Sequence, residues 1–297
     1  MHRAQLLAYI TLAVVWGVSF VLVLRTVEAF GWVGAVGFRA LVACAILVLI
    51  AIATRRRLDF GGQWIALAVV GATTVTGQLL GLAFATPRIG TAMTAILVGT
   101  IPLFSMVIGH AWGIEHVRRS GRMGLLIGLG GIVLLVGFPA VPVTGDFVLG
   151  CAAAVFGCIC SAVGGNWARR HLRRIGSWEQ TIGAFLFGGL LALPFLAIVP
   201  VAALPRPIDI GILVLLAGMC SSLAYILYFR LIAEVGATIA VSVEFGTTAV
   251  AVFVGAVLLG EPLTALQLAG GAIIIAGCMM VLDLLPLPPR RIPTTGA

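Results

Sequence analysis

The stretch GTAMTAILVGTIPLFSMVIGHAWGIE (90–115) decides the fold, because a second version of it occurs later in the chain as GATIAVSVEFGTTAVAVFVGAVLLGE (236–261). Each version begins at a glycine, continues through a long apolar run and ends at a glutamate. An apolar helix of about 20 residues crosses a hydrocarbon core of about 30 Å. The repeated unit is therefore a candidate membrane span that ends in an acidic residue.

The rest of the chain has the same apolar character. Of its 297 residues, 61% are hydrophobic and 9% are charged, whereas about a quarter of the residues in a soluble domain are charged. Spanning segments must be helices or closed barrels, and uninterrupted apolar runs exclude a barrel. We predict an all-α membrane protein with ten transmembrane helices, at roughly residues 5–24, 33–53, 64–85, 90–112, 122–139, 147–168, 178–199, 208–229, 237–259 and 264–285.

Arginine sets the predicted orientation, because the chain contains no lysine. Positive residues collect in cytoplasmic loops, so both termini are expected in the cytoplasm. With this orientation, 14 of the 18 arginines are cytoplasmic: Arg3, Arg55, Arg56, Arg57, Arg118, Arg119, Arg122, Arg169, Arg170, Arg173, Arg174, Arg230, Arg290 and Arg291. We interpret the clusters RRR (55–57) and RRHLRR (169–174) as topology anchors, and we expect no nucleic-acid partner.

The repeat extends beyond the two quoted segments. A shift of 146 positions aligns residues 90–135 with 236–281 without a gap, and Gly90, Gly109, Glu115, Gly124, Ile127 and Gly131 then coincide with Gly236, Gly255, Glu261, Gly270, Ile273 and Gly277. We divide the chain into two halves of five spans, 1–140 and 141–285, and a cytoplasmic tail, 286–297. An odd number of spans inserts the second half upside down, and inverted repeats are typical of secondary transporters. The prediction is two inverted five-helix repeats around a central cavity.

These features resemble a known family. Ten spans, a five-plus-five repeat, and the endings WGIE (112–115) and LLGE (258–261) are similar to the drug/metabolite transporter superfamily, and above all to its EamA-type branch. The most specific part is GAVLLGEPLT (255–264), followed by LAGGAIIIAG (268–277). The resemblance implies a central cavity lined by spans 1, 3, 4, 6, 8 and 9, and export of amino acids or other small metabolites. One departure is that many relatives carry a proline near the middle of span 9, where this chain has EFGTTAV (244–250).

Glu244 is the most informative single residue, because it lies about seven residues, or roughly 10 Å, into its span. A charged side chain near the bilayer centre costs at least about 2.5 kcal/mol. We expect it to face a cavity, where it binds a substrate amine or exchanges a proton. The alternative is a structural carboxyl held by neighbouring Ser or Thr side chains.

Arg39 is an arginine well inside a span, about six residues from its outer end. One interpretation is a clamp for a substrate carboxylate, which suits the forked guanidinium group. The favoured interpretation is that the side chain snorkels to the outer interface, because span 2 does not line the cavity of the family that the chain resembles. We expect no ion pair between Arg39 and Glu244, which lie in opposite leaflets.

The remaining predicted substrate-binding residues are polar or aromatic. Trp16 falls in the middle of span 1 beside Gly17 and Ser19, whereas the other tryptophans mark span ends. We predict that Trp16 and Ser19 form one wall of a substrate pocket, with ordinary helix packing as the alternative. Gln78 and Tyr225 place polar groups on spans 3 and 8, where each alternatively satisfies a neighbouring helix. Weaker candidates are Tyr228, His110 and Asn166.

Two further sets of residues concern the shape of spans 4 and 9. Gly99 and Pro102 in span 4 are a predicted hinge, because proline removes a helical hydrogen bond, and Gly246 is the predicted hinge of span 9. The alternative is a static kink. Glu115 and Glu261 match the helix-end acid of the family, and we expect each carboxylate to stabilise the N-terminus of the helix that follows it.

Common catalytic motifs are absent from the sequence. No GxxxxGK[ST], GxSxG or HExxH occurs, so no enzymatic activity, cofactor or metal site is expected. We predict a secondary active transporter that exports small metabolites, amino acids first, across the inner (plasma) membrane by alternating access. Protons are the candidate coupling ion, and no oligomer is required. The alternatives are a proton-coupled exporter of lipophilic cations or drugs and, from another class, a membrane-embedded enzyme or lipid-handling protein.

Overall fold

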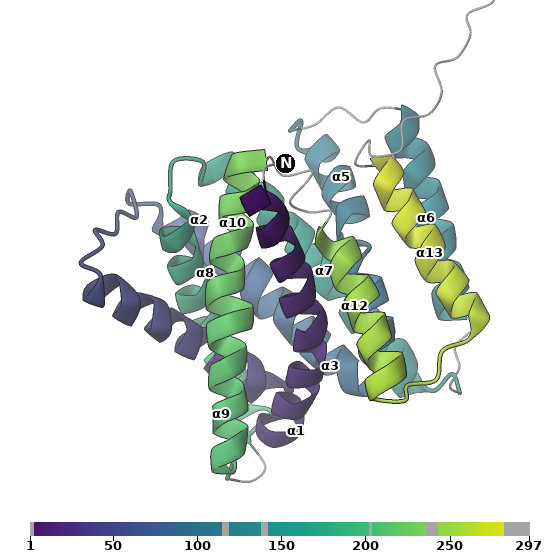
Figure 1. Ribbon diagram of the computed structural model, residues 1–297, viewed down its shortest axis with the longest axis horizontal. Helices are drawn as coiled ribbons and strands as arrows, with labels where there is room; N and C mark the ends of the chain where they lie inside the picture. The colour runs from purple at the N-terminus through teal and green to yellow at the C-terminus, as the bar shows by residue number, and fades with distance from the viewer. Residues whose placement is uncertain (1–2, 115–118, 138–141, 202–203, 236–242, 282–297) are drawn as a thin grey trace, which may run out of the picture.

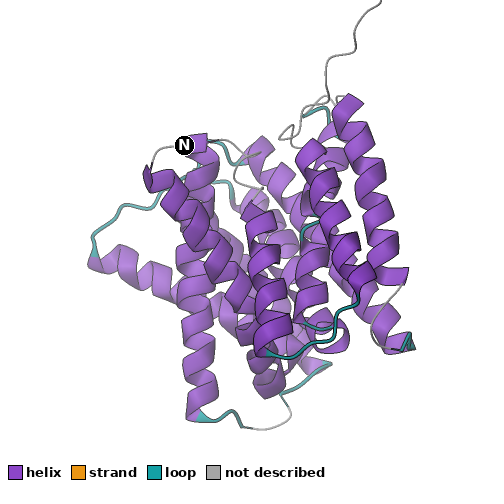
Figure 2. Cartoon of the chain, turned by 45° about the vertical axis from the view of Figure 1, so that its right-hand side comes forward, coloured by secondary structure: helices purple, strands orange, loops and turns teal. Residues whose placement is uncertain are grey.

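The computed structural model describes residues 3–114, 119–137, 142–201, 204–235 and 243–281. Within these ranges every regular element is a helix (Figure 2). The α-helices are α1 (Arg3–Ala53), α2 (Trp64–Val70), α3 (Gln78–Ile89), α4 (Thr91–Val98), α5 (Ile101–Ala111), α6 (Arg119–Gly137), α7 (Gly145–His171), α8 (Ser177–Ala192), α9 (Pro207–Leu215), α10 (Ala224–Val235), α12 (Val243–Leu258) and α13 (Ala265–Val281). The π-helical segment η1 (Gly71–Gly77) continues α2, and the π-helical segment η3 (Leu216–Leu223) continues α9. The 3-10 segment η2 (Leu193–Ala197) continues α8.

Several of these helices have membrane length. Six helical stretches are long and apolar enough to cross a bilayer: Arg3–Ala53, Trp64–Ile89, Thr91–Ala111, Gly145–His171, Ser177–Ala197 and Pro207–Leu231. Three shorter apolar helices are Ser120–Leu135, Val243–Leu258 and Ala265–Met280, and the remaining ends of the corresponding predicted spans lie outside the described residues. The prediction of an all-helical membrane protein is confirmed at this level.

Helix α1 contains the first two predicted spans without a loop between them. Residues 25–30 carry no glycine or proline and stay helical, and the chain changes direction at Gly31, where φ is 71° and ψ is 162°. Glycine adopts this conformation without the clash that a Cβ would cause. The connection between predicted spans 1 and 2 is therefore helical up to residue 30 and turns sharply at Gly31.

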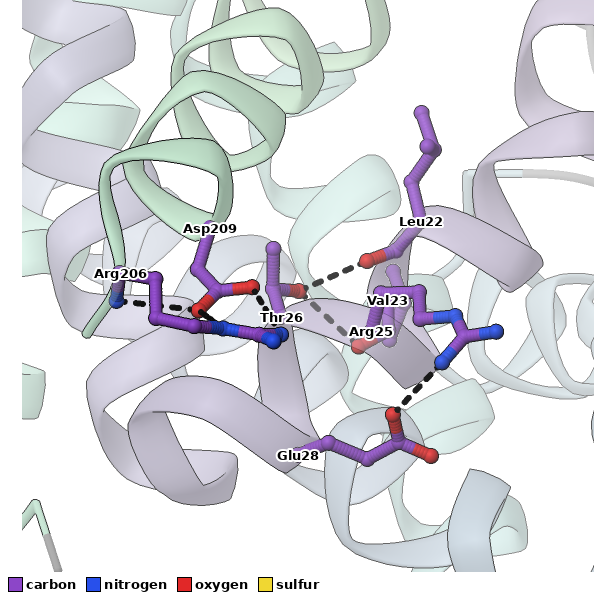
Figure 3. A network of polar contacts seen from close by, with 7 residues as sticks. All are labelled: Leu22, Val23, Arg25, Thr26, Glu28, Arg206 and Asp209. Atoms are coloured by element: carbon purple, nitrogen blue, oxygen red, sulfur yellow. Dashed lines mark hydrogen bonds and ion pairs between the residues drawn. The ribbon is translucent and has the colours of Figure 1, made fainter. Parts of the chain in front are cut away.

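Two arginines of the predicted outer loops pair with acids on their own helices (Figure 3). Arg25 lies 3.4 Å from Glu28, and both side chains are exposed. Arg206 lies 3.0 Å from Asp209, which also accepts a hydrogen bond from the Arg206 backbone N–H and so closes the start of α9. An exposed pair such as Arg25–Glu28 contributes about 0–1 kcal/mol. Arg25 and Glu28 are therefore suitable control positions for substitutions of charged residues in the cavities.

Helices α6 and α13 lie side by side at one edge of the molecule (Figure 1). Their backbones approach through glycines: a Cβ added to Gly277 would lie 2.6 Å from the Gly124 carbonyl oxygen, and one added to Gly131 would lie 2.8 Å from the Gly270 carbonyl oxygen. Glycine permits such close contact between membrane helices. The Gly-rich segments quoted from the sequence therefore form a helix–helix interface.

Gly277→Ala is expected to lower the melting temperature of the purified protein by several degrees, because the added methyl group overpacks this interface at a cost of about 1–3 kcal/mol. The matched control is Gly130→Ala on α6, where nothing lies within 4 Å of the added Cβ and helix propensity favours alanine. Thermal unfolding in detergent measures both. Equal melting temperatures for the two variants would contradict this packing.

The two π-helical segments repeat one another. The Thr76 hydroxyl donates to the Gly71 carbonyl oxygen and to the Gly188 carbonyl oxygen of α8. The Ser222 hydroxyl, 146 residues later, donates to the carbonyl oxygen of Ala217, also 146 residues later, and to that of Ala43 in α1. Each half therefore ties its π segment to a helix of the other half by the same bonding pattern. The internal repeat is visible in hydrogen bonds as well as in the sequence.

Candidate functional site

Two cavities meet at the same four side chains. A cavity of about 80 Å³ and a larger one of about 610 Å³ are both lined by Trp16, Gln78, Tyr225 and Glu244. These residues come from α1, α3, α10 and α12, which belong to predicted spans 1, 3, 8 and 9. Four of the five predicted substrate-binding residues thus lie together at one place, and the fifth, Ser19, lines the smaller cavity.

The cavities extend from this meeting point toward opposite ends of the helices. The smaller cavity reaches Thr26 and Thr86, which follow the predicted outer ends of spans 1 and 3. The larger cavity reaches Arg169, Arg173 and Arg230, which follow the predicted inner ends of spans 6 and 8. The four shared side chains therefore separate two spaces that point to the two predicted sides of the membrane.

Aromatic rings form one wall of the shared site. The Trp16 ring centroid lies 5.6 Å from that of Tyr225 and 5.2 Å from that of Tyr228, and Phe185 packs edge-on against Tyr225 at 5.0 Å. The indole N–H of Trp16 donates to the Cys220 carbonyl oxygen, 3.1 Å away in η3. This hydrogen bond fixes the orientation of the Trp16 ring. Its acceptor belongs to a π-helical segment, a kind of helix that is frequent at functional sites.

Glu244 is half-buried in the first turn of α12. Within the described residues its carboxyl group has no hydrogen bond or ion pair. The Thr248 hydroxyl donates to the backbone carbonyl oxygens of Glu244 and Ala95, at 2.8 and 3.0 Å, and so joins α12 to α4. The neighbouring threonine thus holds the backbone of Glu244 and leaves its carboxyl group facing the cavities.

Gln78 and Thr247 add polar groups that have no hydrogen-bond partner in the part of the chain that the structure describes. Gln78 follows the π segment η1 and is 9% exposed, and its amide group makes no hydrogen bond to a described residue. The Thr247 hydroxyl, on the wall of the smaller cavity, is buried without a partner among the described residues. Sequence reasoning missed Thr247, although it stands three residues after Glu244, on the same helical face. Ser19, in contrast, donates to the Trp16 carbonyl oxygen at 2.6 Å.

The favoured interpretation of Arg39 is wrong. Its side chain does not snorkel, because it is 6% exposed and its Nε donates to the Ser221 hydroxyl at 2.6 Å. It lines the smaller cavity together with Ala35 and Val36 from the same helix, so span 2 contributes to a cavity. The larger cavity likewise receives Gln180 from span 7. The second part of α1 packs against α8 and η3, and this packing turns Arg39 inward.

The three weaker candidates for substrate binding lie in different surroundings. Tyr228 lines the larger cavity beside Trp16. Asn166 is buried and its amide donates to Ser105 and to the Ala162 carbonyl oxygen, which is a structural role. His110 is exposed at the end of α5 and lines neither cavity.

The proposed hinges differ from one another. Span 4 breaks at Gly99 and Thr100 between α4 and α5, and Pro102 stands in the first turn of α5, so the predicted interruption is present. Gly246 lies inside the unbroken helix α12, and a Cβ there would approach the Ala13 Cβ to 2.8 Å. Its observed role is close packing against α1. Movement at these positions stays a prediction.

Glu261 stabilises a helix N-terminus, but not that of the helix that follows it. Its two carboxylate oxygens accept hydrogen bonds from the backbone N–H groups of Thr91 and Ala92, at 2.7 and 2.8 Å. These groups begin α4 in the other half of the chain, after Gly90 with its φ of 85°. The sequence reveals the acid but not this partner, because the contact spans 170 positions. Glu115, its counterpart in the repeat, lies outside the described residues.

The sequence model of the EamA-like transporter family matches residues 3–137 and again residues 148–283, which together make up most of the chain. The chain belongs to the EamA-like transporter family. It contains two EamA domains, and the resemblance inferred from the sequence is confirmed. The prediction of a membrane transporter rather than an enzyme is confirmed by the same match.

Relatives with this arrangement span nearly the same length. The "Uncharacterized inner membrane transporter YedA" of Escherichia coli strain K12 is 25% identical over 288 residues, which are 96% of this chain and 93% of YedA. YedA of Escherichia coli O157:H7 shows the same values. A solved crystal structure superposes with a TM-score of 0.67 at 16% identity and covers 96% of this chain and 98% of that one. This last likeness shows a shared fold.

Proposed function

We propose that this EamA-family protein is a secondary active transporter that exports small metabolites, amino acids first, across the inner membrane by alternating access. The observation that carries the proposal is that two cavities with opposite directions meet at Trp16, Gln78, Tyr225 and Glu244. A site reached from both sides is what alternating access requires. The printed name of YedA, an inner membrane transporter, supports the choice of membrane.

The proposed topology has ten spans in two inverted halves, 1–140 and 141–285, with both termini and the tail 286–297 in the cytoplasm. The equivalent hydrogen bonds of Thr76 and Ser222 support the repeat, since each crosses to the other half. The excess of arginine at one end of the helices supports the orientation. An odd number of spans in each half makes the repeat inverted.

The chemistry of the shared site favours a small zwitterion or amine. Glu244 offers an unpaired carboxyl group, and the Trp16–Tyr225–Tyr228 wall offers aromatic faces to a cationic or apolar group. A polyanion such as a nucleotide needs several cationic side chains around the site. Among the described residues lining the smaller cavity, Arg39 is the single cationic side chain, and the three arginines of the larger cavity, Arg169, Arg173 and Arg230, follow the predicted inner ends of their spans. Protons, exchanged at Glu244, are the proposed coupling ion.

The structure fits a state that faces the cytoplasm. The larger cavity reaches Arg169 and Arg173 at and just after the end of α7 and Arg230 in α10. At the opposite ends, Glu261 links the end of α12 to the start of α4. Opening toward the outside then requires these hydrogen bonds to break and the two spans to part, with the interruption at Gly99–Pro102 as the flexible point of span 4.

Purified protein in liposomes, tested with a panel of labelled amino acids, examines the proposal. We expect substrate-dependent flux for at least one of them above that of protein-free liposomes. Absence of flux for the whole panel rejects the amino-acid proposal.

The second candidate is a proton-coupled exporter of lipophilic cations, and the carboxyl of Glu244 beside three aromatic rings favours it. Ethidium efflux from the same liposomes under an imposed proton gradient distinguishes the two. Ethidium efflux without amino-acid flux favours this second candidate, and amino-acid flux without ethidium efflux favours the first.

A further inference from the structure

Arg39 is a buried cation with no acidic partner in the described part of the chain. Its side chain is 6% exposed and lies about six residues into a predicted span. No Asp or Glu among the described residues forms an ion pair with it, and its one hydrogen bond goes to the neutral hydroxyl of Ser221. Charged residues inside membrane spans are costly and usually pair with an opposite charge or mark a ligand site. The missing partner must therefore be sought in the cavity that Arg39 lines.

The guanidinium group presents its free end to that cavity. Among the described residues, only Nε of Arg39 has a protein partner, the Ser221 hydroxyl at 2.6 Å. The two terminal nitrogens are not among the fully buried atoms that lack a partner. They remain accessible in the smaller cavity, to which Arg39 belongs. The Ser221 bond fixes the plane of the group, since an arginine held at Nε can rotate little. A fixed, planar pair of N–H donors matches the two oxygens of a carboxylate.

The surroundings select a single negative charge. Ala35, Val36, Leu79 and Ala83 supply apolar walls to the smaller cavity, and such walls strengthen a charge–charge interaction by excluding water. No second cationic side chain lines this cavity among the described residues. A dianion such as a phosphate monoester would keep one charge uncompensated.

Glu244 lines the same cavity, and its carboxyl group has no partner among the described residues. Within the same residues no ion pair joins Arg39 to Glu244, so the charge of Arg39 is left to a ligand.

We propose that Arg39 is the carboxylate-binding residue of this transporter and that its substrates carry one carboxylate, held by the terminal nitrogens of Arg39. The assignment of the carboxylate subsite rests on the geometry of the smaller cavity, and its role in export rests on the proposed function. It makes small compounds with one carboxylate and an apolar body, apolar α-amino acids among them, the substrate class.

Three matched probes test the subsite by calorimetric binding to the full-length protein in detergent. L-leucine carries both charged groups, 4-methylpentanoate lacks the amine, and 3-methylbutylamine lacks the carboxylate. In Arg39→Gln we expect the affinity for the two carboxylate probes to fall by about 10- to 100-fold, as lost charge-assisted hydrogen bonds imply, and the affinity for the amine probe to stay the same. Arg25→Gln is the control, because Arg25 is exposed and pairs with Glu28 outside both cavities (Figure 3).

Arg39→Lys covers the case in which the glutamine variant does not fold. It keeps the charge but loses the planar fork and the Nε bond to Ser221. We expect a loss of about tenfold for the carboxylate probes and unchanged binding of the amine probe. An equal loss of all three probes in this variant, or unchanged binding of both carboxylates, overturns the proposal, as does a wild-type protein that binds neither carboxylate.

Leucine flux in liposomes, measured on the same variants, separates the subsite from the proposed function. Arg39-dependent binding of 4-methylpentanoate without flux of any amino acid upholds the subsite and rejects amino-acid export. Leucine flux that is the same in wild type and Arg39→Gln upholds export and overturns the subsite.

Discussion

Glu244→Gln is expected to reduce substrate flux in liposomes by at least about 30-fold, the largest effect of any single substitution in the site. The loss of charge removes an interaction of the kind that contributes about 1.5–3 kcal/mol when the group hydrogen-bonds a ligand, and it also removes the proposed proton carrier. The variant keeps the shape of the side chain and breaks no hydrogen bond of the carboxyl group within the described residues. The melting temperature should therefore stay close to that of the wild type.

Glu28→Gln is the matched control for this experiment. Glu28 is exposed near the middle of α1, just beyond the predicted outer end of span 1, where it pairs with Arg25, and it lines neither cavity. We expect normal flux and normal stability in this variant. If Glu244→Gln transported at the wild-type rate, Glu244 would be a structural residue and the shared site would not be the substrate site.

Glu261→Ala is expected to destabilise the protein by about 3 kcal/mol or more, because two charge-assisted hydrogen bonds to the N-terminus of α4 are lost at once. The contact also joins the two halves of the chain, so its loss destabilises both halves. Thermal unfolding in detergent should show a clear fall in melting temperature. Glu28→Ala, which removes an exposed ion pair, should change stability by less than about 1 kcal/mol.

Gly90→Ala tests the same contact from the other side. Gly90 has a φ of 85°, and an added Cβ would lie 3.2 Å from a Glu261 carboxylate oxygen. Backbone strain and crowding of the carboxylate both predict a loss of stability. The effects of Glu261→Ala and Gly90→Ala should be less than additive in the double variant, since both disturb one contact. Full additivity would show that Glu261 does not hold the start of α4.

Particular residues show how far the sequence could predict this site. Trp16, Gln78, Tyr225 and Glu244 were recognisable because a polar or unusual side chain inside an apolar helix must face something other than lipid. The structure brings all four to one place. Helix positions were equally predictable, since the length of apolar runs follows from the thickness of the bilayer.

Arg39 and Glu261 show what the sequence left open. An arginine six residues from an interface can snorkel or turn inward, and the outcome depends on which face of α1 packs against η3. The partner of Glu261 depends on how the two halves meet. The π segments were also missed, because bonding from i to i+5 leaves no periodic mark in composition. In hindsight, Thr76 of GATTVTG (71–77) and Ser222 of LAGMCSSL (216–223) stand at matching positions of the repeat.

Thiol accessibility tests the central claim most directly, namely that one site is reached alternately from the two sides of the membrane. Ser161→Cys reports on the larger cavity and Val23→Cys on the smaller one, and both positions are partly exposed. Both are placed in a Cys160→Ser background, because the other five cysteines are buried. An impermeant reagent is applied to right-side-out and to inside-out vesicles, with and without the substrate that the liposome panel identifies.

The account predicts that Ser161→Cys reacts only from the cytoplasmic side, that Val23→Cys reacts only from outside, and that substrate changes the two rates in opposite directions. Reaction of both positions from the same side, or rates that rise and fall together, would contradict it.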